Sequence, residues 1–467
     1  MTLLQDLTDL LGTAHVLTGT DLDRYTSDWT THYTSAPMAV VRPGSTAEVS
    51  AVIKLAARHG VPVVPVSGRT GLVGGAMTTG GLMLSVERLN RIREIRPATR
   101  IAIVEAGVVL DRLHAAAEAQ GLYFPLWFGA RGSAMIGGVL STNAGGSNVL
   151  RYGSTRALCL GLEVVLPDGR ILDLMSELHK NNSGYDLRQL FIGAEGTLGI
   201  ITAAVMKLVP RPRAYATATL AARSLPDALA LLNRLQEASG GAVEAFEYMP
   251  GTYMQRLAEQ RPDIRLPFDR RYDTNILVEI ATTMPRDATP GPDGTVPIVA
   301  LLEGVLAQMI DEGAVLDAEI AQNDTQRLAM WKRRELAAEI TVARQPAIDT
   351  DIALPLDLVP EFFTRIEARL PLLDPGCDTL SVVHLGDGNV HFTVFPTREG
   401  LYDTVVEAVE DVVEELHGSF SAEHGVGLSK LNTMARRKDP VALDVMRAVK
   451  AALDPAGLMN PGKVIPD

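Results

Sequence analysis

Apolar and polar residues repeat along this chain at spacings that predict amphipathic helices and buried strands throughout its length. Residues 46–59 place Val49, Val52 and Ile53 at helical spacing, and residues 61–66 form an apolar run typical of a buried strand. We expect further strands at 38–42, 215–221, 243–248, 275–283, 379–385 and 390–395. We expect further helices within 1–30 and at 226–238, 298–312, 324–341, 358–370, 401–417 and 440–452.

The length of the chain and its proline and glycine residues predict more than one domain. A chain of 467 residues is too long for one ordinary hydrophobic core. Glycine is dense before residues 210–213, where the sequence Pro-Arg-Pro-Arg is typical of a domain boundary. Residues 284–297 hold several prolines and glycines and predict a loop.

Composition narrows the class of protein. The net charge is −13 with no block rich in lysine or arginine, which argues against nucleic acid or an anionic membrane as the main partner. The two cysteines, Cys159 and Cys377, lie too far apart in sequence for a disulfide framework, which favours a reducing, cytoplasmic setting. The first residues lack the basic region of a secretory signal. The apolar stretch 298–310 is interrupted by Glu303 and Gln308, so we expect no transmembrane segment.

The most informative chemistry lies late in the chain, in the sequence His-Leu-Gly-Asp-Gly-Asn-Val-His at 384–391. Asp-Gly between apolar flanks is a strong hairpin signal. With these two residues as the turn, His384 would lie directly opposite His391, with Cβ atoms about 4.5–5.5 Å apart. The pair could then share one metal ion, with Glu423 as a third ligand and His424 left as a base. The alternative is a packed histidine pair without a metal.

Three glycine-rich segments occupy the first half, at 65–75, 132–146 and 193–202. Glycine allows backbone N–H groups to approach a pyrophosphate closely and to adopt the positive φ that anion sites need. No G-x-G-x-x-G opens a helix with an acidic residue about 20 positions later, so a Rossmann nicotinamide site is poorly supported. Any one segment alone is typical of a tight loop, whereas three together favour phosphate binding.

These segments, together with residues 150–153 and 182–187, resemble the flavin-binding loops of the vanillyl-alcohol-oxidase-type flavoproteins. The second half, with residues 384–391, 422–425 and 460–463, resembles the C-terminal domain of FAD-linked D-2-hydroxyacid dehydrogenases. The resemblance implies an α+β fold with three parts. The first part is a two-subdomain FAD-binding (PCMH-type) domain at 1–212, which includes an N-terminal helical segment. The second part is an antiparallel-sheet cap or substrate domain at 213–420. The third part is a C-terminal helical segment at 421–467 that returns to the FAD domain.

The resemblance also implies roles for particular residues. His384, His391 and Glu423 would be zinc ligands, His424 the catalytic base, and Arg334 and Thr393 substrate-binding residues. The residues expected to bind a non-covalent FAD are Pro65, Ser67, Gly68, Arg69, Thr70, Gly71, Leu72, Gly132, Ser133, Ile136, Gly137, Gly138, Thr142, Asn143, Gly145, Gly146, Gly196, Gly199, Ile201 and Asn460.

The implied reaction is the oxidation of a D-2-hydroxy acid, D-2-hydroxyglutarate first, to the 2-oxo acid, with hydride transfer to flavin N5 and the proton taken by His424. An unidentified electron acceptor would reoxidise the flavin, and by analogy alone we expect a homodimer.

Four positions depart from the pattern that the resemblance sets. Ser67 replaces a glycine of the first loop, Ala338 a threonine, Asp349 a lysine and Thr393 an asparagine. Losing the lysine removes a cation that would meet a second carboxylate. The alternatives therefore include D-lactate or another short D-2-hydroxy acid as substrate, and an FAD-binding subunit of a glycolate-oxidase-type complex. A zinc hydrolase would explain the histidines but not the glycine loops.

Overall fold

The computed structural model describes residues 2–466, which divide into two compact units. The first unit comprises residues 1–145, 154–210 and 423–467, and the second comprises residues 146–153 and 211–422. The units thus divide at Pro210–Arg211 and at Ala422–Glu423, whereas the sequence predicts boundaries after residues 212 and 420. The short segment 146–153 belongs with the second unit, although the sequence predicts that it lies in the first domain.

One sheet of the first unit has four strands in the order β1-β2-β4-β3, of which β2, β4 and β3 are parallel. Helix α2 (Thr46–His59) begins where the Ser45 hydroxyl accepts the N–H of Glu48, and it ends at Gly60 in the left-handed conformation. Its buried apolar face packs into the same core as α1 and these strands. The elements are α1 (Leu3–Leu11), β1 (Val16–Leu17), β2 (Ala39–Val41), β3 (Val63–Val66) and β4 (Leu82–Ser85).

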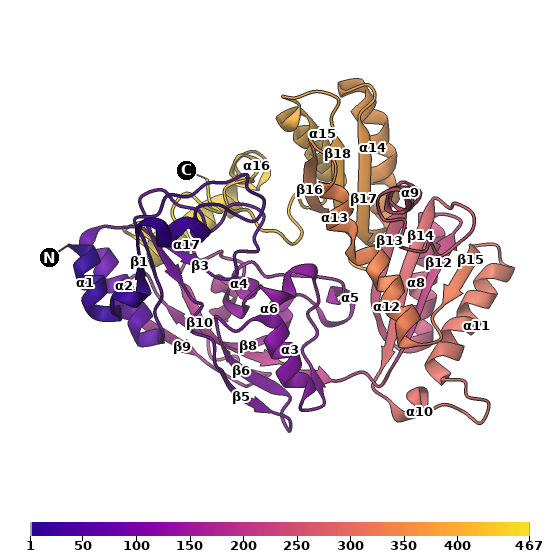
Figure 1. Ribbon diagram of the computed structural model, residues 1–467, viewed down its shortest axis with the longest axis horizontal. Helices are drawn as coiled ribbons and strands as arrows, with labels where there is room; N and C mark the ends of the chain where they lie inside the picture. Colours follow the sequence, from indigo (N-terminus) through magenta and orange to yellow (C-terminus); the bar gives the residue numbers. More distant parts are fainter. Residues whose placement is uncertain (1, 467) are drawn as a thin grey trace. The chain divides into compact units, whose positions relative to one another are not determined.

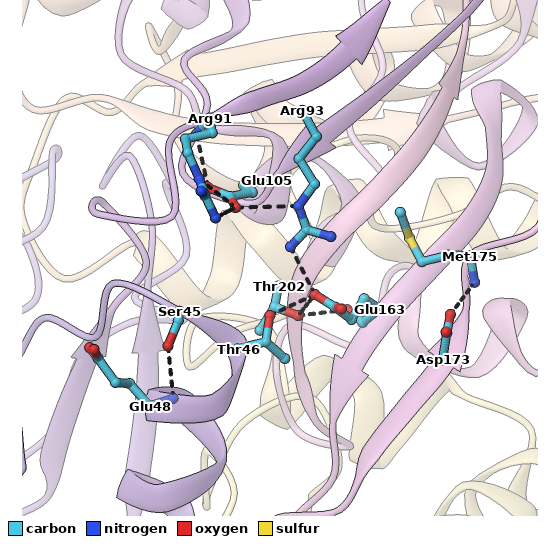
Figure 2. Close-up of polar contacts among 10 residues, drawn as sticks. All are labelled: Ser45, Thr46, Glu48, Arg91, Arg93, Glu105, Glu163, Asp173, Met175 and Thr202. Carbon is cyan, nitrogen blue, oxygen red and sulfur yellow. Dashed lines mark hydrogen bonds and ion pairs between the residues drawn. The ribbon is translucent and has the colours of Figure 1, made fainter.

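The other large sheet of the first unit is antiparallel, in the order β5-β6-β10-β8-β9. Figure 2 shows the polar network around it: Glu105 accepts from Arg91 and Arg93, and Glu163 accepts from Arg93, Thr46 and Thr202. Because Thr46 opens α2, this network ties the helix of the first sheet to the strands of the second.

The remaining elements of the first unit are mostly short. Its strands are β5 (Ile92–Arg96), β6 (Ile101–Glu105), β7 (Leu122–Tyr123), β8 (Cys159–Val165), β9 (Ile171–Leu174), β10 (Ile200–Lys207) and β11 (Val209–Pro210). Its other helices are α3 (Leu110–Glu118), α4 (Ile136–Ser141), α6 (Thr155–Leu158), α7 (Arg188–Phe191), α16 (Leu431–Arg437) and α17 (Pro440–Leu453).

The C-terminal segment is anchored beside β3. The N–H of Val63 donates to the carbonyl of Leu458 at 2.8 Å, and the N–H of Asn460 donates to the carbonyl of Val63 at 2.9 Å. Met459, between them, is buried in the core of the first sheet. These bonds place Asn460 directly beside the strand that leads into the first glycine-rich loop.

The second unit is built on a seven-stranded sheet in the order β15-β12-β14-β13-β17-β18-β16 (Figure 1). Every pair of neighbouring strands in it is antiparallel. The strands are β12 (Ala214–Ala222), β13 (Val243–Pro250), β14 (Thr274–Thr282), β15 (Val315–Ile320), β16 (Ile348–Ala353), β17 (Asp378–His384) and β18 (Asn389–Phe395). The helices are α5 (Val149–Tyr152), α8 (Leu225–Ser239), α9 (Gly251–Gln260), α10 (Pro285–Ala288), α11 (Pro297–Asp311), α12 (Asp324–Glu335), α13 (Ala337–Val342), α14 (Val359–Leu373) and α15 (Tyr402–Glu415).

The two faces of this sheet differ in chemistry. One face shares a large apolar core with α8, α11, α14 and α15. The other face packs against α9, α12 and α13 around a smaller apolar cluster, and it also carries buried polar residues such as Glu247 and Glu279. Because side chains alternate along a strand, Glu247 lies on the opposite face from Phe246 and Tyr248, which belong to the large core.

Three sequence predictions of secondary structure differ from the fold. The N-terminal helix ends at Leu11 because Gly12 adopts φ 82°, and short 3-10 turns follow it. The helix predicted at 324–341 is interrupted at Leu336, which separates α12 from α13. The loop predicted at 284–297 contains the one-turn helix α10. No helix among residues 2–466 is long and apolar enough to cross a membrane.

Candidate active site

The hairpin of β17 and β18 carries the two histidines, but its register is not the predicted one. His384 pairs with Asn389, and His391 pairs with Val382. The prediction that His384 lies directly opposite His391 is therefore wrong. The two histidines are diagonal neighbours, offset by two residues along β18.

The reason for the altered register is the loop, which comprises residues 385–388 rather than the predicted Asp387–Gly388 alone. The N–H groups of Asp387 and Gly388 both donate to the carbonyl oxygen of His384, at 3.1 and 3.0 Å. Gly388 adopts φ 82°, and a Cβ atom there would lie 2.1 Å from the carbonyl oxygen of Leu354. Only glycine suits that position, so the turn is fixed by a contact with a distant segment as well as by local sequence.

The two imidazoles are close together even though the predicted pairing of His384 with His391 is wrong. Asn389 and His391 are two residues apart on one strand, so His391 faces the same side of the sheet as His384. The ring centroids lie 5.4 Å apart with the ring planes at 79°. Two imidazoles at this separation suit one divalent metal ion of the zinc type.

A buried carboxylate connects His384 to Arg334. Glu247 on β13 is 1% exposed and pairs with His384 across the strands. Its Oε1 lies 2.8 Å from Nδ1 of His384, and its Oε2 accepts from Nε of Arg334 at 2.8 Å. Burial raises the pKa of Glu247, but the adjacent His384 and Arg334 oppose this effect and hold the pKa below its ordinary value.

The buried guanidinium group of Arg334 has a donor that no other described residue uses. It lies in the last turn of α12 and is buried. Among the described residues its Nη2 is buried without a hydrogen-bond partner. A buried guanidinium nitrogen rarely stays unsatisfied, so this atom points to a ligand that accepts a hydrogen bond.

His391 also lies beside a buried carboxylate. Asp351 on β16 is its partner in the sheet, and Oδ1 of Asp351 lies 3.6 Å from Nδ1 of His391. The same oxygen accepts from Nδ2 of Asn389 at 2.9 Å. Both histidines therefore turn Nδ1 toward an acid, so that Nε2 would be the nitrogen that binds a metal.

Two of the departing positions meet in the structure. Asp349 and Thr393 pair across β16 and β18, and the Thr393 hydroxyl donates to Oδ1 of Asp349 at 2.6 Å. Thr393 is buried and lies on the same face of β18 as His391, two residues away. A polar pair without a positive charge thus occupies these two positions.

Glu423 and His424 are the first two residues of the last segment of the first unit. They follow Ala422, whose N–H donates to the carbonyl of Asp351 at 3.2 Å. Glu423 thus directly follows a residue, Ala422, that is hydrogen-bonded to Asp351 of β16. Asp351 is the residue of β16 that pairs with His391 of β18.

The backbone just after His424 is held by Glu195 of the third glycine-rich segment. Oε1 and Oε2 of Glu195 accept the N–H groups of Val426 and Gly427, at 2.7 and 3.0 Å. Burial raises the pKa of Glu195, and these two N–H groups oppose the rise. The third loop therefore fixes the path of the chain near the predicted base.

The three glycine-rich segments converge within the first unit. A Cβ atom on Gly68 would lie 2.3 Å from the carbonyl oxygen of Ser133, and one on Gly196 would lie 2.3 Å from the Pro65 ring. The Ser67 hydroxyl accepts the N–H of Gly138 at 3.2 Å. Ser67, the departure in the first loop, thus binds the second loop. Of the predicted cofactor residues, only Gly146 belongs to the other unit.

The first unit also presents an unused acceptor atom and an open glycine position that suit a large polar cofactor such as FAD. Asn460 is 1% exposed and donates to the carbonyls of Gly75 and Glu195, at 3.0 and 2.7 Å. Among the described residues its Oδ1 is buried without a hydrogen-bond partner. At Gly71 a Cβ atom would find nothing within 4 Å, so the first loop has open space beside it.

Sequence reasoning missed Glu247, Asp351 and Glu195. Each is an acid in a mostly buried segment, and Glu195 and Glu247 have apolar or small residues directly before and after them, as in the run Ala-Phe-Glu-Tyr-Met around Glu247. A carboxylate at such a position must find partners, since an unpaired buried charge is costly. That rule was the available signal, but it could not identify the partners.

Comparison with known proteins agrees with this geometry. Residues 37–175 match the family model described as FAD binding domain, and residues 211–464 match the model described as FAD linked oxidases, C-terminal domain. Among solved structures, 4-ethylphenol oxidase from Gulosibacter chungangensis superposes with a TM-score of 0.73 at 19% identity, covering 100% of this chain and 97% of that one. A structure of p-cresol methylhydroxylase gives 0.72 at 16% identity, covering 100% and 96%. These two likenesses support the predicted α+β, PCMH-type fold.

Curated relatives match the chain almost from end to end. The D-2-hydroxyglutarate dehydrogenase of Stutzerimonas stutzeri is 35% identical, over 99% of this chain and 98% of its own length. The mitochondrial D-2-hydroxyglutarate dehydrogenase of Bos taurus is 35% identical, over 94% of this chain and 79% of its own length. Taken with the two family models, these relatives show that the chain belongs to the FAD-linked D-2-hydroxyacid dehydrogenases of the vanillyl-alcohol-oxidase type.

Proposed function

We propose that this protein oxidises D-2-hydroxyglutarate, or a closely related D-2-hydroxy acid, to the 2-oxo acid with the aid of FAD and zinc. The names of the relatives support the substrate class. The single observation that carries the proposal is the chain of contacts from Arg334 through Glu247 to His384. In this proposal, one buried carboxylate, that of Glu247, positions both the group that binds the substrate carboxylate, Arg334, and a group that binds the metal, His384.

Each residue then has a chemical task. Arg334 binds the C1 carboxylate through its remaining donors and so fixes which face of C2 is presented. His384, His391 and Glu423 would hold the zinc ion, and His424 would accept the proton of the hydroxyl group as general base. When bound, FAD would supply the acceptor for the hydride from C2, and zinc would make the hydroxyl group more acidic.

A shorter hydroxy acid, such as D-lactate, is the second candidate. The Asp349–Thr393 hydrogen bond supports it, because neither residue carries a positive charge for a second carboxylate. Asp349 would repel that carboxylate if the substrate reached it. The alternative changes the substrate's far end and leaves the chemistry at C2 the same.

Anaerobic reduction of the flavin tests the proposal. The purified protein is mixed with the D and L forms of 2-hydroxyglutarate and lactate and with glycolate, with added zinc or with a chelator, and loss of the oxidised flavin absorbance is followed. We expect D forms alone to reduce the flavin and the chelator to slow the reaction. Reduction by no hydroxy acid would overturn the proposal. Reoxidation by oxygen, a quinone or an electron-transfer flavoprotein then identifies the acceptor.

A further inference from the structure

Glu247 differs from the other buried acids of the second unit in what it touches. It offers one oxygen to a histidine and the other to an arginine, each at 2.8 Å, and it is almost fully buried. Glu279, one strand away on β14, instead accepts from Arg327 of the same helix α12, from Trp331 and from Thr217. Among the described residues no hydrogen bond joins Glu279 to a histidine.

We infer that Glu247 is a positioning residue for the proposed reaction, because it sets the tautomer of His384 and the orientation of Arg334 at the same time. The purpose of this arrangement rests on the proposed function. The arrangement itself rests on two hydrogen bonds, a cross-strand pair and the burial of one side chain.

The first effect of Glu247 is on the histidine ring. An ionised carboxylate only accepts hydrogen bonds, so Nδ1 of His384 must carry the hydrogen that is shared with Oε1. In a neutral ring Nε2 then holds the lone pair. Acids that accept from metal-binding histidines fix the ring in this way and raise the basicity of the metal-binding nitrogen.

The second effect is on the guanidinium group. Nε of Arg334 is bound to Oε2, which fixes the plane of the planar guanidinium and hence the direction of Nη2. The Glu247 carboxylate is therefore hydrogen-bonded both to Arg334, which would bind the substrate, and to His384, which would bind the metal. Its negative charge also separates the positive charge of Arg334 from that of a metal ion bound to His384.

Replacing Glu247 by glutamine gives a sharp prediction about the tautomer. An arginine side chain has only donors, so the amide oxygen of glutamine would turn to Nε of Arg334. The amide NH2 group would then face Nδ1 of His384, which must become an acceptor. The ring would shift its hydrogen to Nε2 and lose the lone pair that binds a metal. In the double variant Glu247→Gln with Arg334→Met, the arginine donor is absent. The glutamine amide oxygen would then be able to accept a hydrogen bond from Nδ1 of His384.

The experiment uses the flavoprotein in five forms: wild type, Glu247→Gln, the double variant with Arg334→Met, Glu279→Gln as the matched control, and His384→Gln for assignment. Nitrogen-15 labelling of the nine histidines allows NMR to report the tautomer of His384 in metal-free protein. The signal is assigned by its absence in His384→Gln. Titration with Co²⁺ alone measures metal affinity, and steady-state kinetics separate KM from kcat.

We expect Glu247→Gln to show the Nε2–H tautomer, to bind Co²⁺ about 10- to 100-fold more weakly, and to have a raised KM. The double variant should return to the Nδ1–H tautomer, and Glu279→Gln should match the wild type in tautomer and Co²⁺ affinity. An unchanged tautomer in a folded, flavin-containing Glu247→Gln protein would overturn the inference. If the wild type binds no Co²⁺, the zinc part of the proposed function fails, whereas the tautomer readings still decide the role of Glu247.

Discussion

Glu195 and Val426, 231 positions apart in the sequence, are joined by a hydrogen bond of 2.7 Å from the backbone N–H of Val426 to the Glu195 carboxylate. The second carboxylate oxygen accepts the N–H of Gly427. The third glycine-rich loop therefore holds the backbone two and three residues beyond His424. A residue of the flavin-binding half thus controls where the proposed base can lie.

Glu195→Gln should lower kcat without releasing the flavin. Glutamine has a single side-chain acceptor, so one of the two backbone N–H groups would face an amide donor. The cost of about 1–3 kcal/mol for an unsatisfied buried group would loosen the segment after His424 and reduce kcat by about tenfold or more. Steady-state kinetics measure kcat, and the absorbance of the bound flavin measures how much flavin the protein retains.

Glu163→Gln is the matched control, because Glu163 is an acid of the same unit whose partners are Thr46, Thr202 and Arg93. It should keep the wild-type kcat. Equal rates for Glu195→Gln and the wild type would show that the bonds to Val426 and Gly427 do not position the base.

The network in Figure 2 should make stability depend on acid pH through Glu105. Burial raises the pKa of Glu105, but the side chain and backbone N–H of Arg91 and the side chain of Arg93 outweigh this and hold it below the ordinary value of 4.5. The stabilisation is therefore complete above pH 4.5 and is lost as the pH falls through the lowered pKa. Arg91 is 73% exposed, so we expect Glu105→Gln to cost only about 1–2 kcal/mol at neutral pH.

Urea unfolding of both proteins between neutral and acid pH measures this difference, which should shrink as the pH falls below about 4.5. Glu195 provides a contrast of opposite sign, because burial raises its pKa. Above the pKa of the unfolded chain, Glu195 loses its proton more readily in the unfolded chain than in the folded protein. The wild type should therefore lose stability relative to Glu195→Gln as the pH rises over that range. A constant difference for Glu105 across the series would refute its assignment as an ionised partner of Arg91.

Gly388→Ala should damage the hairpin more than an ordinary loop substitution. The residue has φ 82°, and the added Cβ atom would lie 2.1 Å from the Leu354 carbonyl oxygen. Gly313→Ala is the control, since Gly313 has φ 72° with nothing within 4 Å of its Cβ position. We expect a loss of about 1 kcal/mol for the control, from backbone strain alone, and of about 3 kcal/mol or more for Gly388→Ala. Equal losses of unfolding free energy would show that the close approach to Leu354 has no effect on stability.

The same glycine explains where prediction from sequence succeeds and where it fails. Helix α2 follows from its apolar spacing and from caps within a few residues, Ser45 and Gly60. The hairpin of β17 and β18 also follows from local pattern, but its register goes with a loop of residues 385–388, in which Gly388 lies close to Leu354, a contact that no local signal reveals. Proximity of His384 to His391 survived because strand alternation puts both on one face in either register.

The partners of buried charges were the part that the sequence could not supply. The family resemblance points to Arg334, whereas Glu247 is one of two acids in a buried strand that lies 87 residues earlier. Their meeting depends on the order of strands β13, β17 and β18 and on α12 covering that face of the sheet. Such pairings arise from topology, which short-range patterns do not determine.

Asp349→Lys should shift substrate preference toward the five-carbon diacid. Lysine at this position would replace a negative charge by a positive one beside Thr393, on the strand next to His391. A hydrogen bond to a charged group contributes about 1.5–3 kcal/mol when buried, and Asp349 is exposed, so we expect about a tenfold rise in the ratio of kcat/KM for D-2-hydroxyglutarate over D-lactate. The gain should lie in KM, because the second carboxylate is remote from the reacting carbon.

Asp349→Asn separates two explanations of that gain, since it removes the repulsion without adding a cation. We expect it to give a smaller rise in the same ratio, and Asp357→Lys, an exposed acid outside the sheet, to give none. If Asp349→Lys left the ratio unchanged, the far carboxylate would be bound elsewhere. The pair Asp349–Thr393 would then be a structural contact of β16 and β18, and its departure from the family pattern would say nothing about the substrate.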